Sequence, residues 1–395
     1  MSKKIEFLVF FIIITVLVGW GQYIIPIKLE ISDTQVVETI GLDSADNEEV
    51  SISLLFEPLR EEGDQDSPKE KNLTVTSKSF VGVEKGVQNY EDKIFVGSHI
   101  KNVIVGENMA QNGLVRAIEF LSKNNEFRLD SKIYVAKESS ASEVFNQGID
   151  NGYIVSDRID SLSLSDRGER EVRSVEVVDV VRMMLSNKKA GVIPCIQIVE
   201  NGEKQLSDYI INASKDEKKR IELAGYAVIK DAKLIGYLGK IESMGYDLVR
   251  NLISEEGIRL LYNNDIVGIA LTGSSSKMEF EFSGDTLTKV IIKIDTTNSV
   301  LETNSGKNVF AGDIDALEEL ENNYLEDVVK TTVEYAQNVN VDFLEIGVNF
   351  ELKHPYKWRK VKDNWDKMFS TIPVEVEVKS NIDEQYGILS STDKK

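Results

Sequence analysis

Few side chains of this chain have the type and spacing that catalysis requires, and one Ser-x-x-Lys pattern comes nearest. Ser274 and Lys277 have the spacing that, in serine acylating enzymes, places a lysine amine one helical turn from the nucleophilic hydroxyl. Here the pattern lies between two strand-like runs, and neither Ser-Asp-Asn nor Lys-Thr-Gly follows it. Because short motifs often match by chance, we interpret residues 274–277 as a polar hairpin loop.

The other candidates for a nucleophile, a base or a metal ligand are isolated in the sequence. Cys195 is the one cysteine and lies in an apolar run, which predicts a small buried side chain and excludes an intramolecular disulfide. The two histidines, His99 and His354, are too few for a histidine-rich metal site. His99 opens a predicted strand without an obvious partner, which favours a structural role. The sequence has neither a Walker A motif nor Gly-x-Gly-x-x-Gly. We therefore expect no catalytic residue, no metal and no cofactor.

The composition predicts a globular body with an acidic surface. The 395 residues are 42% hydrophobic and 28% charged, which is enough apolar material to bury real cores. The formal net charge is −20, and such a surface repels nucleic-acid phosphates and anionic lipid headgroups. We therefore expect no nucleic acid partner, and no anionic membrane surface as the main partner of the body.

Strand-like and helix-like segments alternate in the first half of the body. Residues 50–56 alternate with period two and predict a half-buried strand. A helix over about 80–90, strands over 99–106 and 130–137, and one helix within 107–124 are also predicted. The apolar residues of that last helix share one face: Leu114, Ala117, Ile118 and Leu121. This order of segments predicts a mixed α/β layer.

The second half contains a hairpin and a long helix. A helix capped by Ser174 and a strand over 191–200 precede a polar stretch, 201–220, which is a candidate linker. Two strand-like runs flank Asp231 and Ala232 and predict a hairpin. A long helix is expected to start near Asp313, with one apolar stripe formed by Leu317, Leu320, Tyr324 and Val328.

These segments predict an α+β or mixed α/β protein with three domains after an N-terminal transmembrane anchor. The predicted domains are an N-terminal α/β domain over 28–203, a small middle domain with the hairpin and a helix over 204–262, and a C-terminal domain with a sheet and long helices over 263–395.

The anchor is predicted from residues 7–27, which contain no charged side chain. Twenty-one helical residues would span roughly 30 Å, the thickness of a bilayer core. Trp20 and Tyr23 suit the far interface, and Lys3 and Lys4 favour a cytoplasmic N-terminus. We interpret the segment as an uncleaved anchor with the body outside. A cleaved signal and a buried core helix are the alternatives.

One stretch, 354–369, combines aromatic and basic residues. Trp358, Val361, Trp365 and Phe369 share one helical face, and Pro355 suits the first turn of a helix. Both a membrane-surface helix and a core helix with solvated lysines would have this pattern. We favour the core interpretation, because aromatic stripes at helical spacing usually pack inward.

Four segments, taken in order, resemble the Ger(x)C family, the C subunits of bacterial spore germinant receptors. An early Gly-Leu-Asp strand (VVETIGLDSA) is similar to the family's Gly-Ile-Asp strand. The segment from His99 to Lys137 is similar to a family stretch through His99, Gly106, Glu107, Gly113 and Arg128. The hairpin is similar through Gly225, Ala227, Lys230, Leu234, Gly236, Tyr237 and Leu238. The terminal region is similar through Asp342, Gly347, Pro355, Trp358 and Trp365.

The resemblance implies a non-catalytic subunit of a nutrient receptor complex in the spore inner membrane. It implies a role in assembly or signal coupling in germination, with receptor A and B subunits as partners, and structural roles for the motif positions. Family members typically carry a lipidated cysteine after the signal, but here "LVGWGQ" occupies that region. A spanning helix over 7–27 can replace the lipid. The alternatives are an anchored extracytoplasmic protein that binds a small nutrient, and a hydrolase.

Overall fold

The computed structural model describes most of the body. The described residues are 34–46, 48–56, 70–90, 94–152, 154–163, 174–186, 190–200, 219–253, 256–304 and 311–383, with 7, 10–12, 14 and 15 near the N-terminus. Most of the predicted anchor, 7–27, and of the predicted linker, 201–220, lies outside these residues. None of the helices in the described part is long and apolar enough to cross a bilayer.

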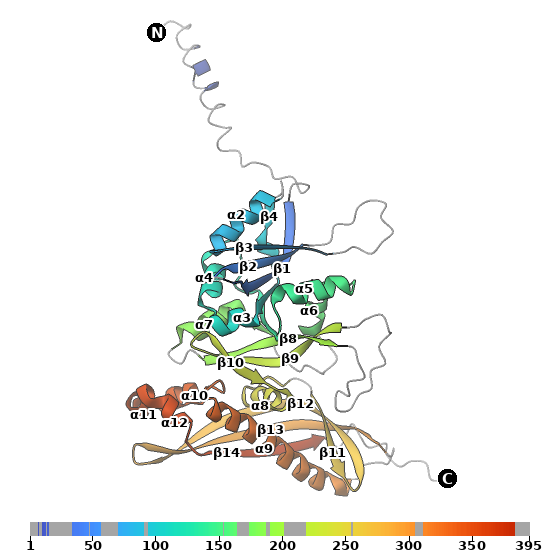
Figure 1. Ribbon diagram of the computed structural model, residues 1–395. Helices are drawn as coiled ribbons and strands as arrows, with labels where there is room; N and C mark the ends of the chain where they lie inside the picture. Colours follow the sequence, from blue (N-terminus) through green and yellow to red (C-terminus); the bar gives the residue numbers. More distant parts are fainter. Residues whose placement is uncertain are drawn as a thin grey trace, which may run out of the picture.

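The upper part of the molecule is built on a ten-stranded sheet (Figure 1). Its main order is β10-β9-β8-β6-β5-β1-β2-β3, with β4 paired to β1 and β7 to β6. The strands are β1 (Thr34–Ser44), β2 (Val50–Phe56), β3 (Lys71–Ser77), β4 (Ile94–Val96), β5 (Asn102–Gly106), β6 (Lys132–Lys137), β7 (Val175–Glu176), β8 (Ala190–Glu200), β9 (Lys219–Lys230) and β10 (Lys233–Leu238).

Helices cover both faces of this sheet. The central strands β1, β5, β6 and β8 run parallel, so the connections between them must cross over the sheet. One face packs against α2 (Phe80–Tyr90), α3 (Glu107–Asn112), α4 (Val115–Lys123) and α7 (Val177–Leu185). The other face packs against α5 (Ala141–Asp150) and α6 (Val155–Ser163). The predicted mixed α/β layer is confirmed.

Two local predictions for this part are wrong in detail. Strand β2 is present, but all of its residues are buried rather than half of them, because it has helices on both sides. The single helix expected within 107–124 is two helices, since Gly113 has φ +133 and ends α3. The expected apolar face of Leu114, Ala117, Ile118 and Leu121 is buried as predicted.

The predicted hairpin is confirmed, and it joins two cores. Asp231 and Ala232 have φ values of 49° and 58°, which a two-residue type I′ turn requires. Along β9 the side chains alternate between faces: Tyr226 and Val228 enter the lower core, and Ala227 and Ile229 enter the core of the first sheet. Strand β9 also pairs with β8. The division into three domains stays a prediction, and this pairing favours assigning the hairpin to the first sheet.

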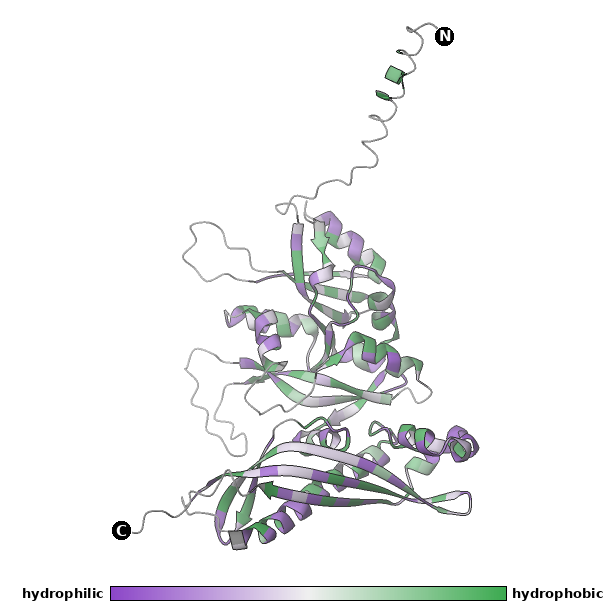
Figure 2. Cartoon of the chain, turned by 180° about the vertical axis from the view of Figure 1, so that it is seen from behind, coloured by the Kyte–Doolittle hydropathy of each residue, from purple (hydrophilic) through white to green (hydrophobic). Residues whose placement is uncertain are grey.

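The lower part is a four-stranded sheet in the order β11-β12-β13-β14, curved around a long helix. Figure 2, the view from behind, shows its long strands crossing the width of the molecule. The strands are β11 (Glu256–Tyr262), β12 (Asp265–Ser283), β13 (Thr286–Thr303) and β14 (Val374–Asp383). The helices are α8 (Lys240–Val249), α9 (Ile314–Asn338), α10 (Ile346–Lys353), α11 (Pro355–Val361) and α12 (Trp365–Phe369). Short 3-10 turns are η2 (Gly97–His99), η3 (Ala311–Asp313) and η4 (Lys362–Asn364).

The long helix α9 is confirmed, but its buried stripe differs from the predicted one. Leu317 and Val328 are buried as expected, whereas Leu320 and Tyr324 are exposed. Glu321 occupies the buried face in their place. The face that α9 turns toward the core is fixed at the sheet edge, where side chains of α9 accept hydrogen bonds from the backbone of β14.

Candidate functional site

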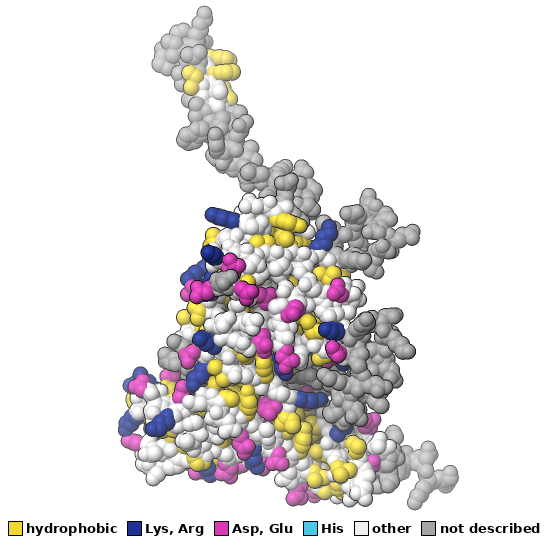
Figure 3. Space-filling model, viewed as in Figure 1, with side chains coloured by type: hydrophobic (Ala, Val, Ile, Leu, Met, Phe, Trp, Pro, Cys, Tyr) yellow, Lys and Arg dark blue, Asp and Glu magenta, His cyan; other side chains and the backbone are white. Residues whose placement is uncertain are grey.

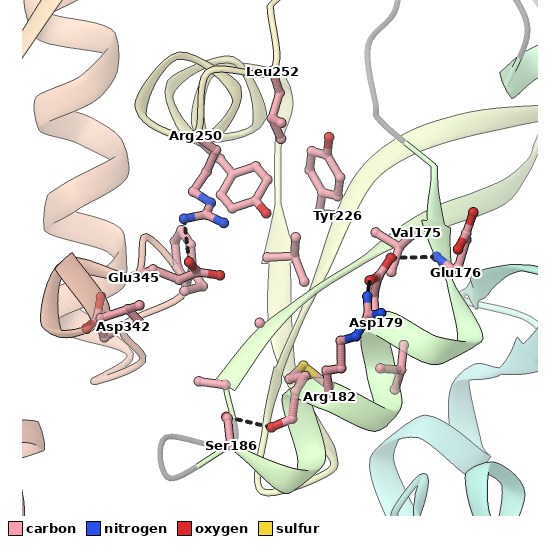
Figure 4. Close-up of a pocket in the computed structure, with 18 of the residues that line it drawn as sticks. Val175, Glu176, Asp179, Arg182, Ser186, Tyr226, Arg250, Leu252, Asp342 and Glu345 are labelled. Atoms are coloured by element: carbon pink, nitrogen blue, oxygen red, sulfur yellow. Dashed lines mark hydrogen bonds and ion pairs between the residues drawn. The ribbon is translucent and has the colours of Figure 1, made fainter. Parts of the chain in front are cut away.

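A cleft with a volume of about 880 Å³ lies between the two sheets (Figure 4). Helix α7 and strands β8 and β9 form the wall on the side of the first sheet, and the end of α8 and the loop before α10 form the wall on the side of the lower part. The polar side chains that project toward it include Asp179, Arg182, Tyr226, Arg250 and Glu345.

Both arginines of this cleft are paired with carboxylates of its lining. Arg182 Nη1 lies 2.9 Å from Asp179 Oδ1, and Arg250 Nη1 lies 2.5 Å from Glu345 Oε2. The Tyr226 hydroxyl donates to Asp247 Oδ1 at 2.8 Å. The lining includes no histidine and no cysteine among the described residues. The cleft could therefore hold a polar ligand only by exchanging existing partners, and its side chains offer no obvious nucleophile with a base.

The predicted catalytic pattern of Ser274 and Lys277 does not assemble. Both residues lie in the middle of β12, so the expected hairpin loop is wrong. Their partners on β13 are Thr296 and Lys293. Residues three apart on a strand point to opposite faces, so the amine cannot reach the hydroxyl. Cys195 is fully buried as predicted, and this burial raises the pKa of its thiol above the usual range.

Gly106 allows an acidic side chain to cap a helix across the sheet. A Cβ at Gly106 would overlap Asp43 Oδ1. The Asp43 carboxylate accepts hydrogen bonds from the backbone N–H groups of Ala141 at 2.8 Å and Ser142 at 3.1 Å, at the start of α5. Burial nevertheless raises the pKa of Asp43 above its usual value, against the lowering effect of these two bonds. Gly106 therefore supports a junction between β1, β5 and α5.

Glu107 and Tyr237 connect the first helix after β5 to the hairpin. The Tyr237 hydroxyl donates a hydrogen bond to Glu107 Oε1, and the Lys137 ammonium lies 5.2 Å from the centre of the Tyr237 ring. Burial, and then the bond to Glu107, raise the pKa of Tyr237 above its usual range. These two motif positions therefore hold β10 against α3.

The two hairpin glycines lie at close approaches, Gly225 within the hairpin and Gly236 against the lower part. Gly225 has φ +72, and a Cβ there would overlap the carbonyl oxygen of Leu238, which is itself fully buried. At Gly236 a Cβ would lie 2.5 Å from the hydroxyl of Tyr335 on α9. A side chain at Gly225 would push β9 away from β10, and one at Gly236 would push the hairpin away from α9.

The terminal motif forms the aromatic core of the lower part. Pro355 occupies the first turn of α11, and Trp358 and Trp365 are buried with ring centres 5.2 Å apart. Trp365 Nε1 donates to Asp342 Oδ2 at 2.9 Å. The same carboxylate accepts from the backbone of Gly347 at 2.8 Å. The core interpretation of residues 354–369 is confirmed, although the stretch forms two short helices rather than one.

His99 and Arg128 lie apart from these junctions. His99 is exposed in η2, so the expectation that it opens a strand is wrong. Both residues line a shallow hollow of about 390 Å³. Arg128 Nε donates to Asp130 Oδ1 at 2.8 Å, in an exposed ion pair.

Sequence reasoning missed one acidic residue that the structure buries, Glu321, and the contacts of two others, Asp43 and Asp342, that stand in the family segments. Asp43 and Asp342 each cap the start of a distant or later helix, and Glu321 lies inside the core under α9. A signal for Glu321 existed, because it stands in helical register with Leu317, Leu325 and Val328. The pairing of Asp43 with α5 has no local signal.

The role of Gly106 predicts a large cost for a single methyl group. Gly106→Ala should lower the free energy of unfolding by about 2–4 kcal/mol, because it forces the Asp43 carboxylate off the α5 cap. Gly257→Ala is the matched control, since no atom lies within 4 Å of its Cβ position. Urea denaturation of the full-length chain in detergent measures both. Equal midpoints for the two variants would show that the Asp43 cap does not depend on Gly106.

Comparison with known proteins agrees with this architecture. The family model for the spore germination protein N-terminal domain matches residues 28–198, and the model "Spore germination B3/ GerAC like, C-terminal" matches residues 224–386. Spore germination protein KC of Bacillus subtilis (strain 168) is 23% identical over 90% of each chain. Spore germination protein B3 of the same organism is 21% identical over 80% of this chain and 81% of its own.

A solved structure shares the fold. The crystal structure of the GerBC protein superposes with a TM-score of 0.56 at 16% identity, and covers 87% of this chain and 96% of that chain. The matches define the class as a spore germination protein with two family regions in tandem. The chain belongs to the Ger(x)C family, the germinant receptor C subunits, as the motif resemblance implied.

Proposed function

We propose that this chain is the C subunit of a nutrient germinant receptor complex in the spore inner membrane. The observation that carries the proposal is the match of both family regions, 28–198 and 224–386, to the body of the chain. The subunit works by protein–protein contact, in receptor assembly or in coupling of the nutrient signal. Its partners are the A and B subunits of the receptor, residues 7–27 tether it, and the body lies on the outer face.

The positions shared with the family support a framework role rather than a chemical one. Glu107 and Tyr237 join α3 to the hairpin, Gly236 lets the hairpin approach α9, and Trp365 fastens the lower core. The approach of Gly236 to α9 joins the first sheet to the lower part, and each of the other two contacts stiffens the part in which it lies. This is what a subunit needs if it presents fixed surfaces to partners.

The distribution of surface charge favours proteins over nucleic acid as partners. On the face drawn in Figure 3, the described lysines and arginines are scattered among acidic side chains rather than gathered into one patch. With a net charge of −20, such a surface offers no electrostatic attraction to nucleic acid.

The second candidate function, nutrient binding, is favoured by the cleft between the sheets. Its volume of about 880 Å³ suits a small molecule, and Tyr226, Tyr246 and Arg250 line it. Burial raises the pKa of Tyr246 to about 12, so its hydroxyl stays neutral. Against this candidate, Arg250 is already bound to Glu345. A ligand carboxylate would have to displace that partner.

Thermal unfolding of the full-length chain in detergent separates the two candidates. With L-amino acids, sugars and nucleosides at millimolar concentration, we expect melting temperatures within 1 °C of the ligand-free value. The test is sensitive, because a ligand that binds and is present at 100 times its Kd would stabilise the folded chain by about 2.7 kcal/mol. A saturable increase for one nutrient, lost in Arg250→Ala and kept in Arg259→Ala on the outer face of β11, would contradict the assembly proposal.

A further inference from the structure

An apolar pocket lies beneath α2 within the core of the first sheet, and we call it the α2 pocket. Its volume is about 530 Å³. The floor consists of side chains that solvent barely reaches, with Ile40, Ile52 and Leu54 from the sheet and Val83 and Val87 from α2. Protein interiors pack as densely as organic crystals, so an apolar hollow of this size is unusual as a structural feature. It is typical of a site that receives another molecule.

Aromatic rings stand around the rim of the α2 pocket. Phe95, Phe120 and Phe127 line it and are half-buried. Phe120 stacks on Phe80 with ring centres 4.6 Å apart and meets Phe127 edge-on at 5.1 Å. Rings held in this way offer a rigid apolar surface, which loses little conformational entropy when it is covered.

Two carboxylates lie at the same rim. Glu84 and Glu126 both line the pocket. Glu84 accepts a hydrogen bond from the Asn124 side chain, and burial together with the nearby Glu126 carboxylate raises the pKa of Glu84. Neither glutamate forms an ion pair with a described lysine or arginine. A cation at this rim would relieve the repulsion between the two carboxylates.

The apolar face of α2 continues past the pocket. Phe80, Val83 and Val87 are buried, and Tyr90 is the next residue in the same helical register. Tyr90 is nevertheless 68% exposed. A small molecule in the pocket would leave this ring uncovered, whereas a protein segment could cover both. A second copy of the chain would bring its own acidic surface, at a net charge of −20, toward the two glutamates.

We propose that the α2 pocket docks a segment of a partner protein whose apolar side chains fill the hollow and whose lysine or arginine lies between Glu84 and Glu126. This inference rests on the proposed function, because the partner is taken to be another receptor subunit. Buried apolar anchors flanked by a charged group are the usual centre of such an interface.

A photo-crosslinker at the rim tests the docking site. We would replace Gln88, which lines the pocket and is exposed, by p-benzoylphenylalanine in the tagged full-length chain in sporulating cells. The expected product is an adduct with a receptor A or B subunit, formed through a peptide that combines apolar residues with lysine or arginine. The double variant Glu84→Lys/Glu126→Lys should reduce this adduct at least tenfold.

The controls separate docking from folding and from net charge. Glu319→Lys/Asp327→Lys makes the same change in charge on the exposed face of α9 and should leave the adduct unchanged. Tyr90→Ser removes an exposed ring that the fold does not need, and should weaken the adduct at least threefold with an unchanged melting temperature.

Several outcomes would overturn the inference. An adduct only with a second copy of this chain, with lipid or with a small molecule would exclude a partner segment. An adduct unaffected by charge reversal and by Tyr90→Ser would exclude this pocket. If one of these two outcomes is observed and the wild-type chain still co-purifies with receptor subunits, the proposed function stands and only the docking site is rejected. If the wild-type chain brings down no receptor subunit, the proposed function fails, and the docking inference fails with it.

Discussion

Replacing Trp365 by alanine should lower the free energy of unfolding of the lower part by about 3–5 kcal/mol, the range for a large aromatic removed from a core. The ring is 3% exposed and contacts Trp358 and Phe350, with ring centres 5.2 and 5.9 Å away. The loss also removes the indole N–H from Asp342, which caps the start of α10. Chemical denaturation followed by circular dichroism measures the change.

Trp365→Phe separates the two contributions to that loss. It keeps a six-membered ring in the core but removes the hydrogen bond at 2.9 Å, so it should lower the free energy of unfolding by about 1–3 kcal/mol, less than Trp365→Ala. An unchanged melting temperature for Trp365→Ala, with receptor assembly lost, would instead place the ring at a contact with another subunit.

Replacing Glu321 by glutamine should stabilise the protein at alkaline pH by about 3 kcal/mol. Glu321 is fully buried, and neither carboxylate oxygen makes a hydrogen bond of good geometry within the described part of the chain. Burial raises the pKa of this carboxyl from 4.5 to about 7, although the nearby Ser380 hydroxyl opposes the shift. The ionised form is therefore disfavoured in the folded state, and each pKa unit corresponds to about 1.4 kcal/mol.

The sign of this effect fixes its pH profile. Below pH 4.5 the carboxyl is protonated in both the folded and the unfolded chain, so the variant and the wild type should have similar stability. Between pH 4.5 and about 7 the unfolded chain ionises first, and the wild type loses stability relative to the variant. Urea midpoints of the two proteins from pH 4.5 to 8, with Glu319→Gln as the exposed control, test this. A pH-independent difference between wild type and Glu321→Gln would refute it.

Local patterns in the sequence predicted the elements whose stability is local. The turn at Asp231 and Ala232 follows from two strand-like runs separated by two residues, and the structure contains it. The aromatic stripe of Trp358 and Trp365 was assigned to the core because its spacing matches one helical face.

The errors arose where distant residues decide the structure. Residues 274–277 are polar and looked like a loop, but each of them pairs with a residue on β13, so the strand continues through them. The register of α9 is set at the edge of β14, where Asn322 accepts the backbone N–H of Ser380 at 2.7 Å and Glu318 that of Ile382 at 2.9 Å. These bonds turn Glu321 toward the core, although a carboxylate is unfavourable in an apolar environment.

The candidate site was predictable only in part, for the same reason. The family resemblance named the positions of Gly106 and Tyr237, but it did not predict which residues they contact. Gly106 lies against Asp43, and Tyr237 bonds Glu107, in each case across a long stretch of sequence. The α2 pocket combines residues from the sheet, α2 and the turn after α4, and no single segment carries a signal for it.

The most direct test of the account is affinity purification of the tagged full-length chain from the inner membrane of dormant spores. We predict stoichiometric recovery of receptor A and B subunits, with no bound nutrient. Recovery of the chain alone from a soluble fraction, with its partners absent, would contradict the account.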